Sequence, residues 1–331
     1  MSYPLLFEAI VKERLWGGRL LERLYGKIIP FPGPAGESWE ISDRPEGVST
    51  IRNGPWQGQS LRWAMQHYSK ELLGGFPSQS GRFPWLMKIL DAKENLSLQV
   101  HPPAGLALRM GGEPKTEMWW VARADPGALL YAGLKTGTTR QDFIDRIHDG
   151  SVEQCFHQLP VCAGDALFVP SGRVHALGKG LVIFEIQQNS DTTYRVFDWQ
   201  RIGPNGKPRE LHVEPSLACI NFDDFEPSLI SPRRSPDRGF ECQTLVCDPL
   251  FRISICDVEP GDGLARARPI ALDKPSIAAL VEGDLIIEGD GEKASLFPGD
   301  FCLLPASLSQ ARWETQGGAR FLLIEASDNQ T

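Results

Sequence analysis

The sequence predicts a mainly β fold made of two small antiparallel barrels, and three observations favour this fold class. Of the 331 residues, 33 are glycine and 26 are proline, so turn-forming residues are abundant. Short apolar segments bounded by Gly, Pro or Asp recur roughly every ten residues, a spacing typical of sandwiches and barrels. A pattern of turn, buried strand and turn also occurs twice, once in each half of the chain. The length is enough for one large domain or two ordinary ones.

Seven segments have the β-rich composition and the bounding turn residues expected of strands. We expect these strands at residues 116–124, 165–171, 180–188, 251–259, 276–283, 284–290 and 320–326. Residues 225–239 (FEPSLISPRRSPDRG) are rich in Pro, Ser and Arg and are typical of a linker. We therefore expect a first domain at residues 1–224 and a second at residues 240–331.

Two stretches have helical periodicity, and both lie in the expected first domain. Residues 60–75 place apolar side chains at helical spacing and end on two consecutive glycines, a helix stop signal. Residues 139–159 have a similar apolar face, with Thr138 or Thr139 as the N-cap. The sequence thus predicts two helical insertions in an otherwise β-rich domain.

The repeated pattern places a Gly, a Pro and a final polar residue at the same offsets in both copies. These residues are Gly164, Pro170 and His175 in the first copy, and Gly299, Pro305 and Gln310 in the second. The spacing resembles the second motif of the cupin superfamily, which implies two cupin-like barrels (jelly rolls), of which the second is degenerate. The matched offsets favour common descent over chance, although a Gly-Asp turn before an apolar strand is common. Because His becomes Gln in the second copy, a site built on His175 would exist only once.

Charge, hydropathy and cysteine content argue against several classes of protein. Lys and Arg number 34 and Asp and Glu number 42, so the net charge of −8 argues against a nucleic-acid partner. No apolar run approaches the roughly 20 residues needed to span a bilayer. The charged N-terminal stretch lacks the apolar core of a signal peptide. The seven cysteines form no CxxC pair, so we expect reduced thiols and a cytoplasmic location.

The stretch LQVHPP at residues 98–103 carries two polar side chains on one face of a strand-like segment. In a strand, residues i and i+2 point the same way, so Gln99 and His101 face together. Glu117 stands at the start of another expected strand, and His175 stands at the turn of the cupin-like motif. Two imidazoles, one carboxylate and one amide form a donor set suited to zinc, with iron or manganese as alternatives. A single His is more often a satisfied polar residue than a ligand, but this grouping around strand ends favours a metal site.

Long stretches of the chain resemble the type I mannose-6-phosphate isomerases (phosphomannose isomerases), in particular their short bacterial form. The matching stretches are FEAIVKERLWGGRLLERLYG, GESWEISDRPEGVSTIRNGPWQG, RFPWLMKILDAKENLSLQVHP, GGEPKTEMWWV, VPSGRVHALGKG, EIQQNSDTTYRVFDWQR and PRELHVE. The resemblance implies a metal-dependent isomerase that interconverts mannose 6-phosphate and fructose 6-phosphate through a cis-enediol. It also implies one Zn²⁺ per chain, held by Gln99, His101, Glu117 and His175.

The resemblance assigns roles to further residues by their position in the matching motifs. Arg195 matches a catalytic arginine and Lys115 an active-site lysine, while Lys88 and Ser97 match positions near the substrate phosphate. Cations suit this reaction because negative charge develops on the sugar oxygens. The structural alternatives are an Arg195–Asp198 ion pair, a Lys88 side chain that extends from its strand to solvent, and a turn hydroxyl at Ser97.

The base that moves a proton between C1 and C2 of the sugar has two candidates, Glu185 and Asp191. They are the carboxylates nearest to the expected ligand strand in the sequence, which leaves the choice between them open. Glu185 lies in an alternating strand and faces either the barrel interior or solvent. If it faces the interior, its charge requires a metal, Lys or Arg partner.

Two other functions fit parts of the pattern. A cupin dioxygenase would hold iron with two His and a carboxylate, but the Lys and Arg residues would then be superfluous. A non-catalytic sugar-phosphate-binding protein would keep the pocket, but the complete ligand set shows no degeneration. Related isomerases also act on other aldoses and ketoses. The expected partner is a small phosphorylated hexose, not a nucleic acid or a membrane, and a monomer is compatible with the sequence.

Overall fold

The computed structural model describes residues 2–203, 206–234, 240–259, 270–271, 274–308 and 310–327. The fold is mainly β, and the strands of its sheets pair antiparallel. In the described part of the chain, all helices lie before residue 220.

Four sheets form the body of the molecule. The five-stranded sheet has the order β10 (Phe156–Pro160), β9 (Leu129–Leu134), β12 (His175–Leu177), β7 (Leu98–Val100), β14 (Tyr194–Phe197). The six-stranded sheet has the order β11 (Ala166–Val169), β8 (Glu117–Ala124), β13 (Leu181–Gln188), β6 (Trp85–Ala92), β3 (Ala35–Ile41), β2 (Ile10–Gly18). All seven strands expected from the sequence are confirmed, three of them in the six-stranded sheet and four in the two sheets of the C-terminal part.

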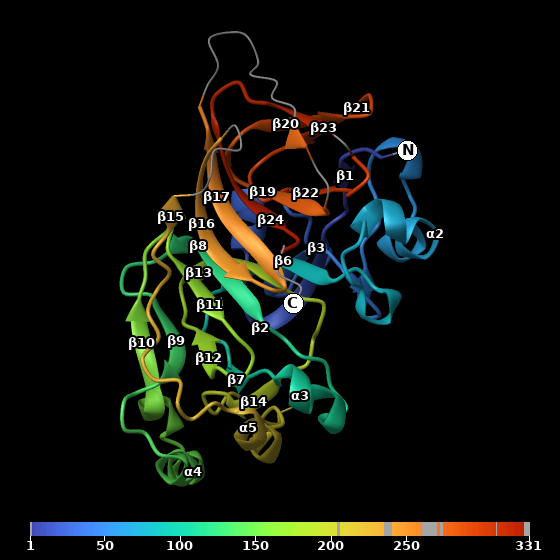
Figure 1. Ribbon diagram of the computed structural model, residues 1–331. Coiled ribbons are helices and arrows are strands. Elements are labelled where there is room, and N and C mark those ends of the chain that lie inside the picture. Colours follow the sequence, from blue (N-terminus) through green and yellow to red (C-terminus); the bar gives the residue numbers. More distant parts are fainter. Residues whose placement is uncertain are drawn as a thin grey trace.

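The C-terminal part contributes the other two sheets. The seven-stranded sheet has the order β1 (Leu5–Leu6), β22 (Phe301–Leu304), β19 (Ser276–Gly283), β24 (Ala319–Glu325), β17 (Phe251–Val258), β16 (Glu241–Asp248), β15 (Arg233–Arg234). The four-stranded sheet has the order β18 (Ile270–Ala271), β23 (Gln310–Glu314), β20 (Leu285–Gly289), β21 (Glu292–Leu296). A separate hairpin joins β4 (Asp43–Arg44) to β5 (Gly47–Val48). In Figure 1 the strands labelled β7, β9, β10, β12 and β14 lie below the orange and red strands of the C-terminal part, whereas β1 lies beside β22.

The sheets stack in the order five-, six-, seven- and four-stranded, because each shared face buries an apolar cluster. The central six-stranded sheet is covered on both faces, so its strands are buried along most of their length. Alternate side chains of β13 divide between the two faces. Phe184 stacks on Phe301 of the seven-stranded sheet, with ring centroids 5.5 Å apart. Glu185 points the other way, into the space between the five- and six-stranded sheets.

Each sheet formed by the described strands is open at its edges. The structure therefore shows two stacked-sheet units, and the expectation of two barrels stays a prediction. The N-terminal strand β1 does not join the unit that follows it in sequence. Leu5 and Leu6 pair with Leu303 and Cys302 of β22 and so complete the edge of the seven-stranded sheet. The first residues of the chain thus tie the two units together.

The helices of the described residues are α1 (Leu20–Tyr25), α2 (Leu61–Leu73), α3 (Ala104–Ala107), α4 (Arg140–Asp149) and α5 (Val213–Cys219), with 3₁₀ turns η1 (Gly54–Trp56), η2 (Gln79–Gly81), η3 (Leu108–Met110) and η4 (Val152–Cys155). None of them has the length and hydrophobicity that a bilayer crossing requires. Helix α2 confirms the first expected helix.

The second expected helix, at residues 139–159, is correct only in its first half. Thr139 is the N-cap, and its hydroxyl accepts a hydrogen bond from the Asp142 amide in a capping box. The helix ends at Gly150, which adopts a left-handed conformation with φ of 80°. Because this is a strong stop signal, the apolar residues beyond it form η4 and then β10. The expectation of a helix through residue 159 is wrong.

The internal repeat is confirmed in its backbone geometry. Gly164 and Gly299 both adopt positive φ, 94° and 89°, in a turn that precedes a buried strand. Asp165 Oδ2 accepts a hydrogen bond from the Cys162 amide, and Asp300 Oδ2 accepts one from the Phe297 amide. The last positions of the two copies differ in burial. His175 is completely buried, whereas Gln310 is exposed to solvent.

Part of the expected linker at residues 225–239 lies along the first unit. The backbone N–H of Ile230 donates to the Ala166 carbonyl, and residues Arg233–Arg234 form β15 against β16. Residues 235–239 lie outside the described residues. The segment therefore contributes an edge strand to the C-terminal sheet.

Two of the seven cysteines form a disulfide, so the expectation of reduced thiols is wrong for this pair. Cys242 of β16 lies directly opposite Cys256 of β17, and the two sulfurs are bonded. Sequence spacing did not reveal the pair because fourteen residues separate the cysteines and only the strand register brings them together. Among the described residues, five further cysteines are free.

Candidate metal centre and adjoining cavity

Three buried side chains form a cluster between the five- and six-stranded sheets. The potential ligand atoms of His101, Glu117 and His175 all lie within 4.8 Å of one another. The two Nε2 atoms are 3.2 Å apart, and Glu117 approaches them at 3.4 and 3.6 Å. The Nε2 atom of Gln99 is 3.3 Å from His175 Nε2. The structure therefore brings together all four residues that the sequence nominated as metal ligands.

Strand register explains this convergence. His175 is the first residue of β12 and pairs directly with Gln99 of β7. His101 follows β7, two residues after Gln99 and on the same face. Glu117 is the first residue of β8, in the sheet that faces them. The cluster therefore lies where strand ends from two sheets meet.

Backbone carbonyls fix the orientation of both imidazole rings. His101 Nδ1 lies 2.9 Å from the Thr192 carbonyl, and His175 Nδ1 lies 2.9 Å from the Arg173 carbonyl. A carbonyl only accepts, so each Nδ1 carries the proton and each Nε2 presents a lone pair. The two lone pairs point into the same small space. Ligand histidines in metal sites are commonly held in this way.

Burial sets the charge states in the cluster. It lowers the pKa of His101 well below its ordinary value and that of His175 to about 3, so both rings are neutral. Burial also raises the pKa of Glu117 to about 7, against the opposing influence of Lys115. The Lys115 ammonium lies 2.9 Å from Glu117 Oε2, whereas Oε1 accepts no hydrogen bond from the described residues.

These features fit a divalent metal ion. Two imidazole lone pairs and the unpartnered Oε1 of Glu117 converge, with only the Gln99 amide group near His175 Nε2 as a possible donor. Such a concentration of buried acceptors is costly unless a cation is bound. Rotation of the Gln99 amide exchanges its nitrogen and oxygen positions, so its oxygen can serve as a fourth donor. Nitrogen and oxygen donors of this kind suit zinc.

A cavity of about 400 Å³ adjoins the cluster at Gln99. Every expected site residue outside the buried cluster lies on its wall: Lys88, Ser97, Lys115, Glu185, Asp191 and Arg195. Seven further residues that were not expected from the sequence also line it: Arg14, Trp16, Glu37, Leu90, Leu96, Thr193 and Arg209. The cavity thus combines cations and carboxylates over one small volume.

Glu185 has the partners that an inward-facing carboxylate requires. Lys88 Nζ lies 3.1 Å from Oε2, and the Trp119 indole N–H donates to Oε1 at 3.2 Å. Burial opposes ionisation, but Lys88 and Lys115 outweigh it and lower the pKa of Glu185. Lys88 is only 4% exposed. The alternative that its side chain extends to solvent is therefore wrong.

Arg195 is a cavity cation whose side chain forms no ion pair with a described carboxylate. Its Nη1 donates to the Glu210 carbonyl at 2.7 Å, while its buried Nε donates to no described residue. Asp198, the alternative structural partner, instead binds Arg201 and Arg209. Burial, together with the nearby Arg209, lowers the pKa of Arg195. Its guanidinium therefore retains free donors for an anionic group.

The missed residues Arg14 and Glu37 form an ion pair on the cavity wall. Arg14 binds Glu37 through two nitrogens at 2.7 and 3.2 Å, and Trp39 donates to the same carboxylate. Both lie in stretches that carry the family resemblance, KERLWGG and GESWEIS. The family resemblance of these stretches was the one sequence signal for the two residues. No spacing rule places β2 and β3 beside a site that is built from later strands.

Comparisons with known proteins agree with this geometry. The profile of the type I phosphomannose isomerase catalytic domain matches residues 5–124. A mannose-6-phosphate isomerase of Streptococcus mutans is 34% identical over 99% of this chain and 100% of its own length. The crystal structure of the mannose 6-phosphate isomerase from Bacillus subtilis has a TM-score of 0.86 and 31% identity, covering 98% of this chain and 99% of its own.

A more distant likeness concerns the fold alone. It is to a mannose 6-phosphate isomerase bound with zinc and yttrium, with a TM-score of 0.75 and 17% identity, covering 99% of this chain and 100% of its own. The full-length relative at 34% identity is decisive for the family. The chain is therefore an enzyme of the mannose-6-phosphate isomerase family, which confirms the resemblance found in its sequence.

Proposed function

We propose that the chain interconverts mannose 6-phosphate and fructose 6-phosphate with the help of one zinc ion. The observation that carries the proposal is the buried His101–Glu117–His175 cluster beside a cavity lined by cations and carboxylates. An isomerase of this type needs positive charge near the sugar oxygens and a base near the carbon that loses its proton. Residues that can meet both requirements line the same cavity.

Zinc would be held by Gln99, His101, Glu117 and His175, and when bound it supplies positive charge that polarises sugar oxygens. The donor set supports this choice, as does the zinc in the distant relative of the same fold. Lys88 and Ser97 are the proposed contacts for the phosphate group. Arg195 stabilises the negative charge that develops on the enediol oxygens, because its donors are not used by a carboxylate.

Of the two candidate bases, the structure favours Asp191. Both oxygens of Glu185 are engaged, by Lys88 and Trp119, and its lowered pKa makes it a weaker base. Asp191 lies on the cavity wall, is exposed and has no hydrogen-bonding partner among the described residues. A base needs a lone pair free to reach the substrate. We assign Glu185 the role of holding Lys88 in place.

The proton transfer then runs as follows in the direction of the ketose. Asp191 removes the proton from C2 of the open-chain aldose, and the C2–H electron pair forms the C1=C2 bond of the enediol. The aldehyde oxygen takes up a proton as its carbonyl bond is lost. The carboxylic acid of Asp191 returns a proton to C1, and the C2 hydroxyl loses its proton to become the ketone.

Turnover of mannose 6-phosphate in D₂O, followed by proton NMR, tests the proposal. The wild type should form fructose 6-phosphate and incorporate deuterium from solvent. Asp191→Asn should lower kcat about 10²–10⁴-fold, the range for loss of a general base. Glu185→Gln should raise KM more than it lowers kcat, because it frees Lys88. Sugar-phosphate binding without isomerisation by the wild type would contradict the proposed activity, and the reverse behaviour of the two variants would make Glu185 the base.

We also propose that the two stacked-sheet units are cupin-like domains, at residues 1–224 and 240–331, linked by residues 225–239. The matching hydrogen bonds at the Gly164 and Gly299 turns support common descent. A cytoplasmic location follows from the proposed substrate, because a phosphorylated hexose is charged and does not cross a bilayer unaided. The chemistry proposed requires one chain only.

A further inference from the structure

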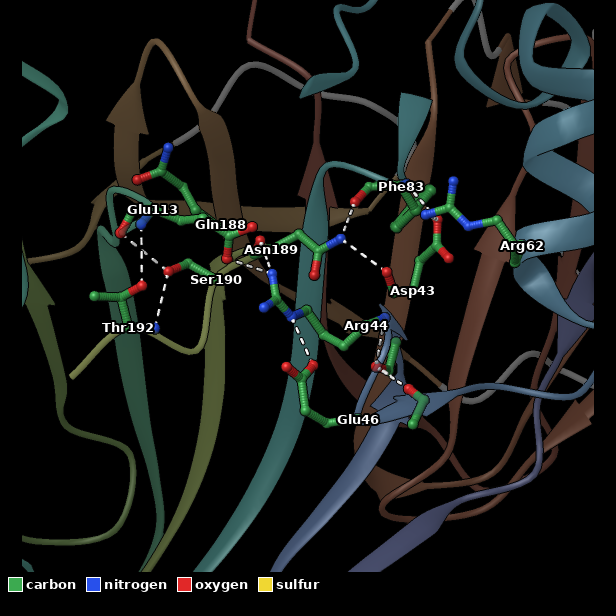
Figure 2. Close-up of polar contacts among 12 residues, drawn as sticks. Asp43, Arg44, Glu46, Arg62, Phe83, Glu113, Gln188, Asn189, Ser190 and Thr192 are labelled. Carbon is green, nitrogen blue, oxygen red and sulfur yellow. Dashed lines mark hydrogen bonds and ion pairs between the residues drawn. The ribbon is translucent and has the colours of Figure 1, made fainter. Parts of the chain in front are cut away.

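Arg44 lies outside the cavity, yet it joins two loops that carry site residues. It belongs to β4, and its side chain is only 7% exposed. Its Nη1 donates to the Glu113 carboxylate and to the Asn189 carbonyl, the latter at 2.9 Å. Its Nε donates to Glu46 at 3.3 Å. Figure 2 shows the guanidinium between the Asn189 loop and Glu46.

The first loop contains Glu113 and Lys115 and leads directly into Glu117, the first residue of β8. The second loop connects β13 to β14, spans residues 189–193 and contains Asp191. Neither loop is part of a strand ladder, so side-chain contacts hold them together. The two loops therefore depend on contacts such as those of Arg44 for their relative position.

A chain of hydrogen bonds leads from Arg44 to a metal ligand. The Glu113 amide donates to Thr192 Oγ1 at 3.0 Å, and the Ser190 hydroxyl donates to the Glu113 carbonyl at 3.2 Å. The Thr192 amide donates to Ser190 Oγ at 3.2 Å. The Thr192 carbonyl then accepts the Nδ1 proton of His101. Figure 2 shows Glu113, Ser190 and Thr192 in this arrangement.

Close packing reinforces these bonds at Gly112. A Cβ at this position would lie 2.8 Å from Thr192 Cγ2, which is tighter than side chains tolerate. The two loops are thus in direct contact beside Glu113. This packing, with the Glu113–Thr192 hydrogen bond, couples the positions of the two loops.

We propose that Arg44 is a positioning residue, which clamps the loop of Glu113 to the loop of residues 189–193 and thereby orients His101 through the Thr192 carbonyl. The same clamp places Asp191 at the cavity. This inference rests on the proposed function, because it assigns Arg44 its effect through the metal centre and the base. Arg44 itself does not line the cavity.

The test compares Arg44→Ala with wild type by three measurements. Zinc affinity, measured by competition with a chromophoric chelator, should fall about 10–100-fold, as expected when a residue behind a ligand is lost. For the holoenzyme, kcat should fall while KM for mannose 6-phosphate changes less than threefold. Hydrogen exchange of amides in residues 189–193 should speed up, whereas exchange in β13 should not change.

Three further variants sharpen the test. Glu46→Ala is the matched control, because it removes a contact of Arg44 without touching either loop, and it should behave as wild type. Arg44→Lys should show an intermediate effect, since an ammonium keeps the charge but cannot reproduce the fork of donors. Glu113→Ala should lower zinc affinity as Arg44→Ala does. The Glu113 side chain is 45% exposed, so its removal should not prevent folding. This variant therefore tests the clamp even if Arg44→Ala does not fold.

Unchanged zinc affinity and unchanged exchange in residues 189–193, with only a lower melting temperature, would overturn the proposal and leave Arg44 a purely structural residue. Failure of the proposed function gives a different result. Wild type would then lack zinc binding or turnover, while exchange in residues 189–193 would still be faster in Arg44→Ala, which supports the clamp.

Discussion

The Nε2 atoms of His101 and His175 face each other at 3.2 Å in the interior of the protein. Both rings donate their Nδ1 protons to backbone carbonyls, so two lone pairs meet with no proton between them. Together with Oε1 of Glu117, which accepts no hydrogen bond from the described residues, this arrangement favours a bound cation.

The two copies of the internal repeat provide a matched pair of variants. His175→Ala should abolish zinc binding and isomerisation with the fold retained, because it removes a central ligand. Gln310→Ala changes the equivalent residue of the second copy, which is exposed, and activity should stay within about twofold of wild type. Metal content and turnover check both. Equal losses in the two variants would show that the second copy has a role in the site.

Arg195→Ala should lower kcat about 10²–10³-fold, a magnitude typical for loss of a donor to developing charge. Its effect on the free energy of unfolding should be small, because no carboxylate loses a partner. Arg209→Ala should behave differently in denaturant, since Arg209 binds the buried Asp198 through two nitrogens. We expect a loss of about 1–3 kcal/mol for that variant. A larger stability loss for Arg195→Ala would mean that its role is structural.

Glu37 should make the protein sensitive to acid. Burial opposes its ionisation, but Lys88 and Arg14 outweigh it and lower its pKa from 4.5 to about 2. A carboxyl with a lowered pKa in the folded state contributes stability above its unfolded pKa, and this contribution is lost as pH falls from about 4.5 through 2. The difference corresponds to about 3 kcal/mol.

Unfolding of Glu37→Gln and wild type at several pH values checks this prediction. The variant should be less stable near pH 6, and the gap between the two proteins should narrow as the pH approaches 2. A gap that is constant across this range would show that the Glu37 charge does not contribute.

Helix α4 allows a test of the fold that is independent of the site. Thr139→Ala removes the capping hydroxyl and should cost about 1 kcal/mol of unfolding free energy. Thr138→Ala is the control, because Thr138 was an equally good N-cap in the sequence and does not cap the helix in the structure. Turnover should be unchanged in both variants. Equal stability of the two would contradict the capping box.

Local patterns predicted much of the site and its strands. The i, i+2 rule placed Gln99 and His101 on one face, as found. The motif placed His175 at a turn, and in the structure His175 is the first residue of β12. The alternation in β13 predicted that an inward-facing Glu185 would need a metal, Lys or Arg partner. In the structure that partner is Lys88. These inferences succeeded because the backbone period of a strand fixes which side chains share a face.

Contacts that depend on strand order could not be predicted in the same way. Arg14 and Glu37 reach the cavity only because β2 and β3 continue the sheet beyond β6. Cys242 meets Cys256 through the register of two neighbouring strands. The end of α4 is a different kind of error, because Gly150 was present in the sequence but the apolar periodicity beyond it was given more weight.

The central claim is that the cluster of Gln99, His101, Glu117 and His175 holds a metal ion that isomerisation requires. Metal content and mannose 6-phosphate turnover of the purified protein, measured before chelation, after chelation and after zinc is restored, test it most directly. We expect about one zinc per chain, loss of turnover when the metal is removed, and recovery of turnover when zinc is restored. Full turnover by metal-free protein would contradict this claim.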